Sequence, residues 1–375
     1  MFQSVLVYGF MMFSMYFLGK TSIYKPQYRK YLRFISVFIF VVFCGLRYDV
    51  GVDFLTYNDI FISFTDDYTN ASAAIYATQR YESGFKLLVQ LCSYLGMGPQ
   101  VIFAVFALIQ ISCVYYVFKD ERQILPYIGF ALIAGGGFFM WMNAVRQITS
   151  FTLFLVAAKM LYEKRYLYVL LMSVSACLMH KSAVLFLPVL VLLPFLSKSI
   201  LSIKWQIILF VFSLVISNLQ VWKYFSDIIM SVLSFMGDFG ERYSSDTILD
   251  VNVELDFGMR MAITIVLNLV CIFYSKHMSS TYNPIYNYFY NIFFVGTILM
   301  QLFIDNHHLT RYALYFSSIT FAVYSYLLAY LGKQRNKYDV LVKFVVIILL
   351  LLYWFRTLQA DDGTASILYK FCFRY

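Results

Sequence analysis

The chain has 375 residues, of which 61% are hydrophobic, 20% aromatic and only 13% charged. This composition excludes an ordinary soluble domain and predicts a protein of the lipid bilayer. The formal net charge of +9 would suggest an anionic partner in a soluble protein, but in a membrane protein it first reports which loops face the cytoplasm. No stretch alternates apolar and polar residues as the strands of a barrel do. We therefore expect an all-α, polytopic integral membrane protein.

Apolar runs of about 15 to 20 residues recur along the chain and match the length of a helix that crosses the hydrocarbon core. The first run has no basic region ahead of it and no cleavage site at its end, which is typical of a retained span. Segment 84–96 is too short for a straightforward crossing, so we interpret it as a half-inserted or interfacial helix. We count about 12 full spans in a single membrane domain, 1–375. The expected spans are 2–18, 34–46, 101–118, 124–142, 148–161, 166–179, 183–196, 205–221, 258–275, 286–303, 312–331 and 340–355.

The basic residues predict the orientation, because cytoplasmic loops of membrane proteins carry an excess of lysine and arginine. The loop after the first span has five basic residues and no acid: Lys20, Lys25, Arg29, Lys30 and Arg33. With this loop in the cytoplasm, that side holds 17 of the 29 basic residues and only 4 of the 20 acids. Both chain ends are then outside, as are two long loops near 47–82 and 222–257.

One polar stretch, residues 45–61 with the sequence GLRYDVGVDFLTYNDIF, lies at the external end of the second span. Ionisable side chains at a membrane edge cost free energy unless they are paired, hydrated or in use, so this stretch is a candidate functional site. Gly51 permits a backbone turn that other residues resist, and we expect this turn to fold Asp53 back towards Arg47. The alternative interpretation is a solvated loop.

Several basic residues lie on the external side, where the positive-inside rule does not place them. They are Arg47, Arg146, Lys181, Arg260 and Arg311, each within a few residues of a span end. One such residue alone is more often a side chain that extends to the membrane interface. Because the planar fork of arginine suits phosphate oxygens, the whole group predicts a site for an anionic lipid headgroup or a diphosphate.

Four motifs, GLRYDVGVDFLTY, NAVRQIT, LMHKSAV and LTRYALYF, occur in this order along the chain. Their order and spacing resemble the EpsG family of bacterial polysaccharide polymerases, which are themselves similar to Wzy-type polymerases. The residues that match the family's motifs are Arg47, Gly51, Asp53, Tyr57, Arg146, Gln147, His180, Ser182, Arg311, Tyr312 and Tyr315. Val52 stands where the family usually has threonine. The resemblance runs from about residue 45 to residue 316, most of the chain.

The resemblance implies a glycosyltransferase that moves a growing glycan from undecaprenyl diphosphate to the next lipid-linked repeat unit, on the external face of the bacterial inner membrane. A sugar hydroxyl attacks the anomeric carbon and the lipid diphosphate leaves, which requires cations for the leaving charge and a base for the hydroxyl proton. We expect the base to be Asp53, with His180 as its competitor. The residues expected to bind substrate or diphosphate are Arg47, Tyr57, Arg146, Gln147, Lys181, Ser182, Arg260, Arg311, Tyr312 and Tyr315.

The partners implied are the lipid-linked repeat units, the bilayer, and a chain-length regulator and a flippase of the same pathway. No nucleic acid, cofactor or metal is expected. His307 and His308 are adjacent and have no spaced partner that would complete a metal site. The six cysteines have no CxxC spacing and are interpreted as small core residues.

Two other functions stay open. A transporter or flippase for a lipid-linked glycan would use the same arginines as a headgroup gate, but it should show internal repeats and broken helices, which the sequence does not clearly show. A polyprenol-phosphate-sugar glycosyltransferase would place acidic residues in its first external loop, as Asp49 and Asp53 do here.

Overall fold

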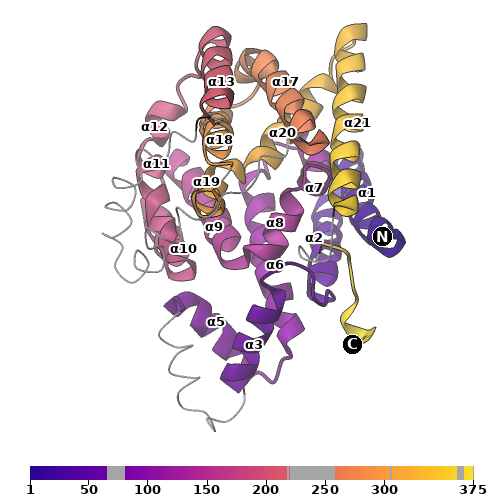
Figure 1. The fold of residues 1–375 in the computed structure, drawn as a ribbon, viewed down its shortest axis with the longest axis vertical. Helices are drawn as coiled ribbons and strands as arrows, with labels where there is room; N and C mark the ends of the chain where they lie inside the picture. Colours follow the sequence, from indigo (N-terminus) through magenta and orange to yellow (C-terminus); the bar gives the residue numbers. More distant parts are fainter. Residues whose placement is uncertain (66–80, 218, 220–257, 305, 361–366, 375) are drawn as a thin grey trace. The chain divides into compact units, whose positions relative to one another are not determined.

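The computed structural model describes residues 1–65, 81–217, 219, 258–304, 306–360 and 367–374. Within these ranges the regular elements are helices, and the one β-bridge joins Arg47 to Phe371 (Figure 1). The expected all-α class is confirmed. The chain divides into two compact units, Met1–Pro194 with Tyr324–Tyr375, and Phe195–Val323. The single membrane domain stays a prediction.

The first unit contains most of the helices. They are α1 (Phe2–Tyr24), η1 (Pro26–Tyr28), α2 (Arg29–Gly45), α3 (Phe54–Thr65), α5 (Ser83–Tyr94), α6 (Pro99–Val117), α7 (Leu125–Ala134), α8 (Gly137–Asn143), α9 (Val145–Tyr162), α10 (Tyr166–Met179), η2 (Lys181–Phe186), α11 (Leu187–Val191), α21 (Lys337–Gln359) and η4 (Cys372–Arg374). The second unit contains α13 (Ile203–Ser217), α17 (Met259–Thr281), α18 (Ile285–Leu302) and α19 (His307–Ser317). Helices α12 (Leu193–Leu196) and α20 (Thr320–Leu331) each cross a boundary between the units.

Five helical stretches of the described chain are long and apolar enough to cross a membrane, or six if one bent pair counts as a span. They are Phe2–Tyr24, Pro99–Val117, Met259–Thr281, Leu309–Leu331 and Lys337–Gln359. The protein is therefore membrane-integral, but the expected number of about 12 spans is not confirmed. One reason is visible at 183–196, where Pro188 and Pro194 break the apolar run into short helices because proline cannot continue a helix interior.

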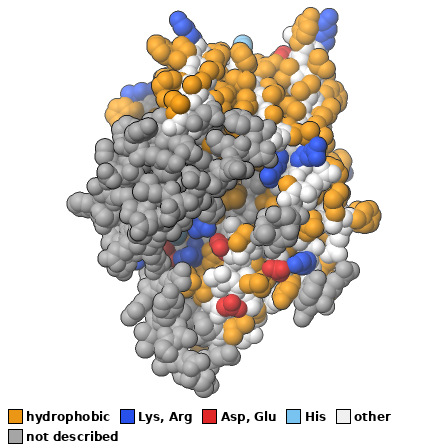
Figure 2. Space-filling model, in the orientation of Figure 1, with side chains coloured by type: hydrophobic (Ala, Val, Ile, Leu, Met, Phe, Trp, Pro, Cys, Tyr) orange, Lys and Arg blue, Asp and Glu red, His pale blue; other side chains and the backbone are white. Residues whose placement is uncertain are grey.

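Helix α21 shows what a lipid-facing surface looks like in this protein. Only 17% of its most apolar window is buried. Leu341, Phe344 and Ile348 are 61%, 60% and 54% exposed and recur at helical spacing, so they lie on one face. Figure 2 shows hydrophobic side chains over the upper part of this helix, with Lys and Arg side chains at its tip. An apolar stripe bounded by basic residues is typical of a helix in contact with lipid.

The expected span at 124–142 is not straight. It consists of α7 and α8, which are bent by 73° at a short break. Gly136 adopts a φ of +78° there, and a Cβ on it would lie 2.5 Å from a ring carbon of Tyr353. Only glycine fits such a position without strain, so the bend is built into the sequence Gly135-Gly136-Gly137.

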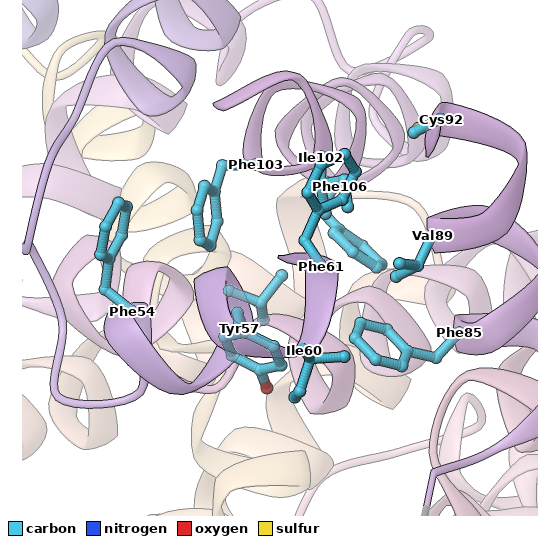
Figure 3. Close-up of a cluster of buried hydrophobic side chains, with 11 residues drawn as sticks. Phe54, Tyr57, Ile60, Phe61, Phe85, Val89, Cys92, Ile102, Phe103 and Phe106 are labelled. Carbon is cyan, nitrogen blue, oxygen red and sulfur yellow. The ribbon is translucent and has the colours of Figure 1, made fainter. Parts of the chain in front are cut away.

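The segment expected as a polar loop at 47–82 instead contains helix α3, which packs against α5 and α6. Its apolar face joins a buried cluster formed by Phe54, Tyr57, Ile60, Phe61, Phe85, Val89, Cys92, Ile102, Phe103, Phe106 and Val145. Figure 3 shows Phe85 of α5 pointing towards the side chains of α3. The rings of Phe54 and Phe103 stack with centroids 4.6 Å apart. The cluster fixes α3 because burying several large side chains outweighs the entropy of ordering a short helix.

Candidate functional site

Among the described residues, two ion pairs near the predicted motifs meet at Glu82, the residue before α5. Its Oε2 lies 2.5 Å from Nη1 of Arg146. Its Oε1 lies 3.1 Å from Nδ1 of His180 and accepts a hydrogen bond of 3.2 Å from the backbone N–H of Lys181. One carboxylate therefore joins two of the predicted motifs, which are far apart in sequence.

Helix packing places these groups together. Arg146 is in the first turn of α9, and Gln110 of α6 donates hydrogen bonds to the carbonyl of Val145 and to the hydroxyl of Thr149. His180 directly follows α10, which is bonded to α9 by the Ser150 hydroxyl. These bonds hold the start of α9 beside the end of α10.

Gly84 brings the start of α5 to the same place. A Cβ on Gly84 would lie 2.8 Å from the carbonyl oxygen of Leu178 in α10, so the two backbones approach more closely than any other residue would allow. Glu82, two residues earlier, is thereby placed beside His180. The close approach of Gly84 to Leu178 therefore determines where the Glu82 carboxylate lies.

Aromatic rings surround the guanidinium of Arg146. Its Nε donates a hydrogen bond of 3.3 Å to the hydroxyl of Tyr57. The rings of Tyr81 and Phe85 lie with their centroids 4.9 Å and 5.3 Å from its central carbon. Cation–π contacts of this kind restrict a long side chain to one orientation.

The charges of the site shift the pKa values of its members. Burial alone would raise the pKa of the Glu82 carboxyl, but the hydrogen bond with His180 and the charge of Arg146 lower it to about 2. Burial raises the pKa of the Tyr57 phenol; Arg146 opposes this shift and Asp53 adds to it. At neutral pH, Glu82 is therefore a carboxylate and Tyr57 a neutral phenol.

The turn before α3 has the glycine conformation expected from the sequence, with a φ of +96° at Gly51. A Cβ on Gly51 would lie 3.0 Å from the carbonyl oxygen of Met142. The backbone N–H of Asp53 donates a hydrogen bond of 2.9 Å to Oδ1 of Asn143. Asp53 is half-buried, and the charge of its carboxylate raises the pKa of Tyr57. The hydroxyl of Tyr57 accepts the hydrogen bond from Arg146.

We expected this turn to fold Asp53 back towards Arg47, but the two side chains form no ion pair in the structure. Arg47 is 2% exposed, and no carboxylate among the described residues forms an ion pair with it. Its guanidinium lies 4.6 Å from the ring centroid of Phe103 and contacts the sulfur of Met142. Burial lowers the pKa of Arg47 to about 10, so the side chain is still protonated at neutral pH.

The other predicted site residues have different positions. In the first unit, Lys181 is exposed, whereas Gln147 and Ser182 are buried. In the second unit, Arg260 and Arg311 are exposed, Tyr312 is half-buried and Tyr315 is buried. Their roles in binding stay predictions.

Sequence reasoning missed Glu82 and Tyr81 as site residues. The available signal was an acid directly before Ser83-Gly84 and an apolar run, which is the same membrane-edge argument that singled out Asp53. Within the described residues, no group of three or more His, Cys, Asp or Glu side chains is arranged to hold a metal ion.

The model of the EpsG family matches residues 30–373, nearly the whole chain. No curated protein and no solved structure matches it. The matched range includes all four motifs and also Glu82 with its partners Arg146, His180 and Lys181. The chain therefore belongs to the EpsG family.

Proposed function

We propose that the protein is a polysaccharide polymerase: a membrane glycosyltransferase that transfers a glycan from undecaprenyl diphosphate to another lipid-linked repeat unit. Membership of the EpsG family supports a role in polysaccharide synthesis. The membrane-spanning helices support a substrate that arrives through the bilayer. The product is an O-antigen, capsule or exopolysaccharide chain.

The observation that carries the proposal is the pairing of Arg146 with His180 through Glu82. Arginine has five N–H donors in a fork that matches phosphate oxygens. Among the described residues, its bonds to Tyr57 and Glu82 use two of these donors, and in the proposed reaction the others bind a diphosphate. The side chain is 20% exposed, so substrate can reach it.

The reaction follows from these roles. A hydroxyl of the acceptor sugar attacks the anomeric carbon of the donor, the new glycosidic bond forms, and the bond to the lipid diphosphate breaks. Asp53 takes the hydroxyl proton. Arg146, His180 and Lys181 stabilise the charge that develops on the leaving diphosphate. Arg47 supports the same site from within the protein.

The positive-inside rule supports an external site. Arg146 is at the start of α9, whereas Lys159, near its end, pairs with Asp120 in a loop that also carries Lys119 and Arg122. Thirteen residues of helix separate the two points by about 20 Å. With the basic loop in the cytoplasm, Arg146 and its partners Glu82 and His180 are near the opposite face of the membrane, which faces the periplasm or cell exterior.

The proposal is tested with the full-length protein in liposomes that contain lipid-linked repeat units extracted from a strain lacking this protein. The polymerase should convert single units into a ladder of longer glycans on the carrier lipid. The deletion strain should accumulate single units on the outer leaflet. Wild-type protein that leaves the units unchanged would contradict the proposal.

The bend between α7 and α8 favours one alternative, a flippase for the lipid-linked glycan, because broken helices are common in transporters. This function predicts that the protein moves labelled units between leaflets without lengthening them. A deletion strain would then accumulate units on the inner leaflet. The same liposomes therefore separate the two functions.

A further inference from the structure

Glu82 is more buried than the two side chains that it joins. Its side chain is 7% exposed, compared with 20% for Arg146 and 16% for His180. The carboxylate thus lies beneath two groups that are accessible from outside. A layer of this kind, an accessible donor supported by a buried acceptor, is how functional side chains are held in position.

We propose that Glu82 is the positioning residue of the site, which holds Arg146 and His180 so that both donate to the same lipid diphosphate. This inference rests on the proposed polymerase function. Glu82 does not touch the substrate; it acts through the two residues that do.

The geometry restricts both partners. Nδ1 of His180 is directed at Glu82, which fixes the orientation of the ring and turns Nε2 away from the carboxylate. Arg146 is held at two points, Nη1 by Glu82 and Nε by Tyr57, so the direction of its fork is set. The backbone N–H of Lys181 donates to the same Glu82 oxygen that contacts His180. This bond also fixes the turn after α10.

Two other roles for Glu82 fit the structure less well. A general base must accept a proton near neutral pH, whereas its neighbours hold the pKa of Glu82 at about 2. A plain surface ion pair would resemble Lys159 with Asp120, in which the acid is 64% exposed. Glu82 instead bonds to three groups from two other segments while buried.

The test measures binding of undecaprenyl diphosphate, with undecaprenyl monophosphate as comparator, by native mass spectrometry of the full-length protein. Glu82→Gln keeps the size of the side chain and removes its charge. It should weaken diphosphate binding by about ten-fold or more, in line with the loss of charge-assisted bonds that orient both donors. Glu82→Asp, which keeps the charge, should recover part of the affinity.

The matched control is Glu163→Gln, the same substitution in an acid that pairs with Lys159 at the other end of α9. It should leave diphosphate affinity within about two-fold of wild type, as expected for a partly exposed pair. If Glu82 only neutralised Arg146, its replacement would tighten binding, because the carboxylate would no longer compete with the diphosphate. Unchanged or tighter binding in Glu82→Gln therefore overturns the proposal.

A second measurement does not need the substrate. In protein labelled with ¹⁵N-histidine, the His180 ring nitrogens should shift in Glu82→Gln and not in Glu163→Gln. If wild-type protein binds neither lipid, the proposed function fails, and the ring signals then decide the positioning role. Unchanged His180 signals in Glu82→Gln overturn it, and shifted signals support it.

Discussion

Two arginines from two of the family's motifs have opposite environments. Arg146 is partly accessible, is paired with Glu82 and is surrounded by three aromatic rings. Arg47 is buried, lies against Phe103 and Met142, and has no hydrogen-bond partner at Nε within the described residues. One arginine is held by an opposite charge and the other by the packing around it.

The C-terminal segment, residues 367–374, is hydrogen-bonded to the backbone on both sides of Arg47. The backbone N–H of Tyr48 donates to the carbonyl of Lys370, and the N–H of Cys372 donates to the carbonyl of Leu46. The Lys370 ammonium pairs with Asp49 at 2.6 Å. Burial of a cation without an anion is unfavourable by on the order of several kcal/mol unless other polar or cation–π contacts replace part of its hydration. From this comparison we predict that Arg146 contacts the substrate and that Arg47 supports the turn.

The largest effect is expected from Arg146→Lys. Lysine keeps the charge but loses the fork that binds Glu82 and Tyr57 together, so the polymerisation rate should fall about a hundred-fold. The rate is measured in liposomes with lipid-linked repeat units. Arg165→Lys, at a side chain that is 46% exposed, is the control and should keep full activity. Full-length polymer from Arg146→Lys would remove the distinction between the two arginines.

The variant Asp53→Asn tests whether the general base lies on the side of the site that contains Arg146. The charge of Asp53 acts on Tyr57, which belongs to the Arg146 side. Asp53→Asn should still bind undecaprenyl diphosphate but lose turnover about a hundred-fold, within the range for loss of a general base. Weaker binding alongside lower turnover would instead indicate a role in substrate positioning. Near-normal polymer length would leave His180 as the candidate base.

The pH dependence of stability tests the interaction of Glu82 with Arg146 and His180. Folding lowers the pKa of Glu82 from 4.5 to about 2, so between these values the unfolded chain binds more protons than the folded one. Glu82 then contributes about 3 kcal/mol above pH 4.5, and this contribution is lost as the pH falls towards 2. The difference in thermal stability between wild type and Glu82→Gln should be largest above about pH 5. The difference should shrink in more acidic buffer, and a constant difference down to pH 3 would contradict the assignment.

At Arg47, we expect the shape of the substituted side chain to affect stability more than its charge. Arg47→Met replaces the buried cation with a flexible apolar chain and should leave thermal stability within about 1 kcal/mol of wild type. Arg47→Lys should lower stability by about 2 kcal/mol, because an ammonium cannot stack flat on Phe103. Both are measured by thermal unfolding in detergent. If Arg47→Met is the less stable of the two, the buried charge has a partner in the native protein.

The smallest effect is expected for the ion pair between Asp49 and Lys370. Both side chains are partly exposed, at 26% and 39%. Lys370→Gln should therefore lower stability by less than about 1 kcal/mol, and added salt should reduce the difference further. A loss several times larger would show that the C-terminal segment depends on this pair and not on its backbone hydrogen bonds.

The candidate site was predictable in part. Arg146 and His180 were identified from their motifs, and the structure brings them together. Their shared partner was not identified, because Glu82 is 64 residues from Arg146 and 98 from His180. Nothing in the local pattern around Glu82 indicates contacts over such distances. The glycine turn before Asp53 was predicted and is present, with a positive φ at Gly51. The hydrogen bond from the Asp53 backbone N–H to Asn143, 90 residues away, could not be predicted from the local sequence.

The sequence by itself determined the helical class, the membrane location and the motifs of the EpsG family, because hydrophobic run length and residue order are local properties. Tertiary structure decided the rest. The contact of Gly84 with Leu178 places Glu82 beside His180, and the break at Gly136 bends α7 against α8. The buried Arg47 side chain lies against Phe103, and the backbone beside it is hydrogen-bonded to residues near the far end of the chain. These features arise only when distant helices pack, since the charge state and accessibility of a side chain depend on neighbours that its own segment does not contain.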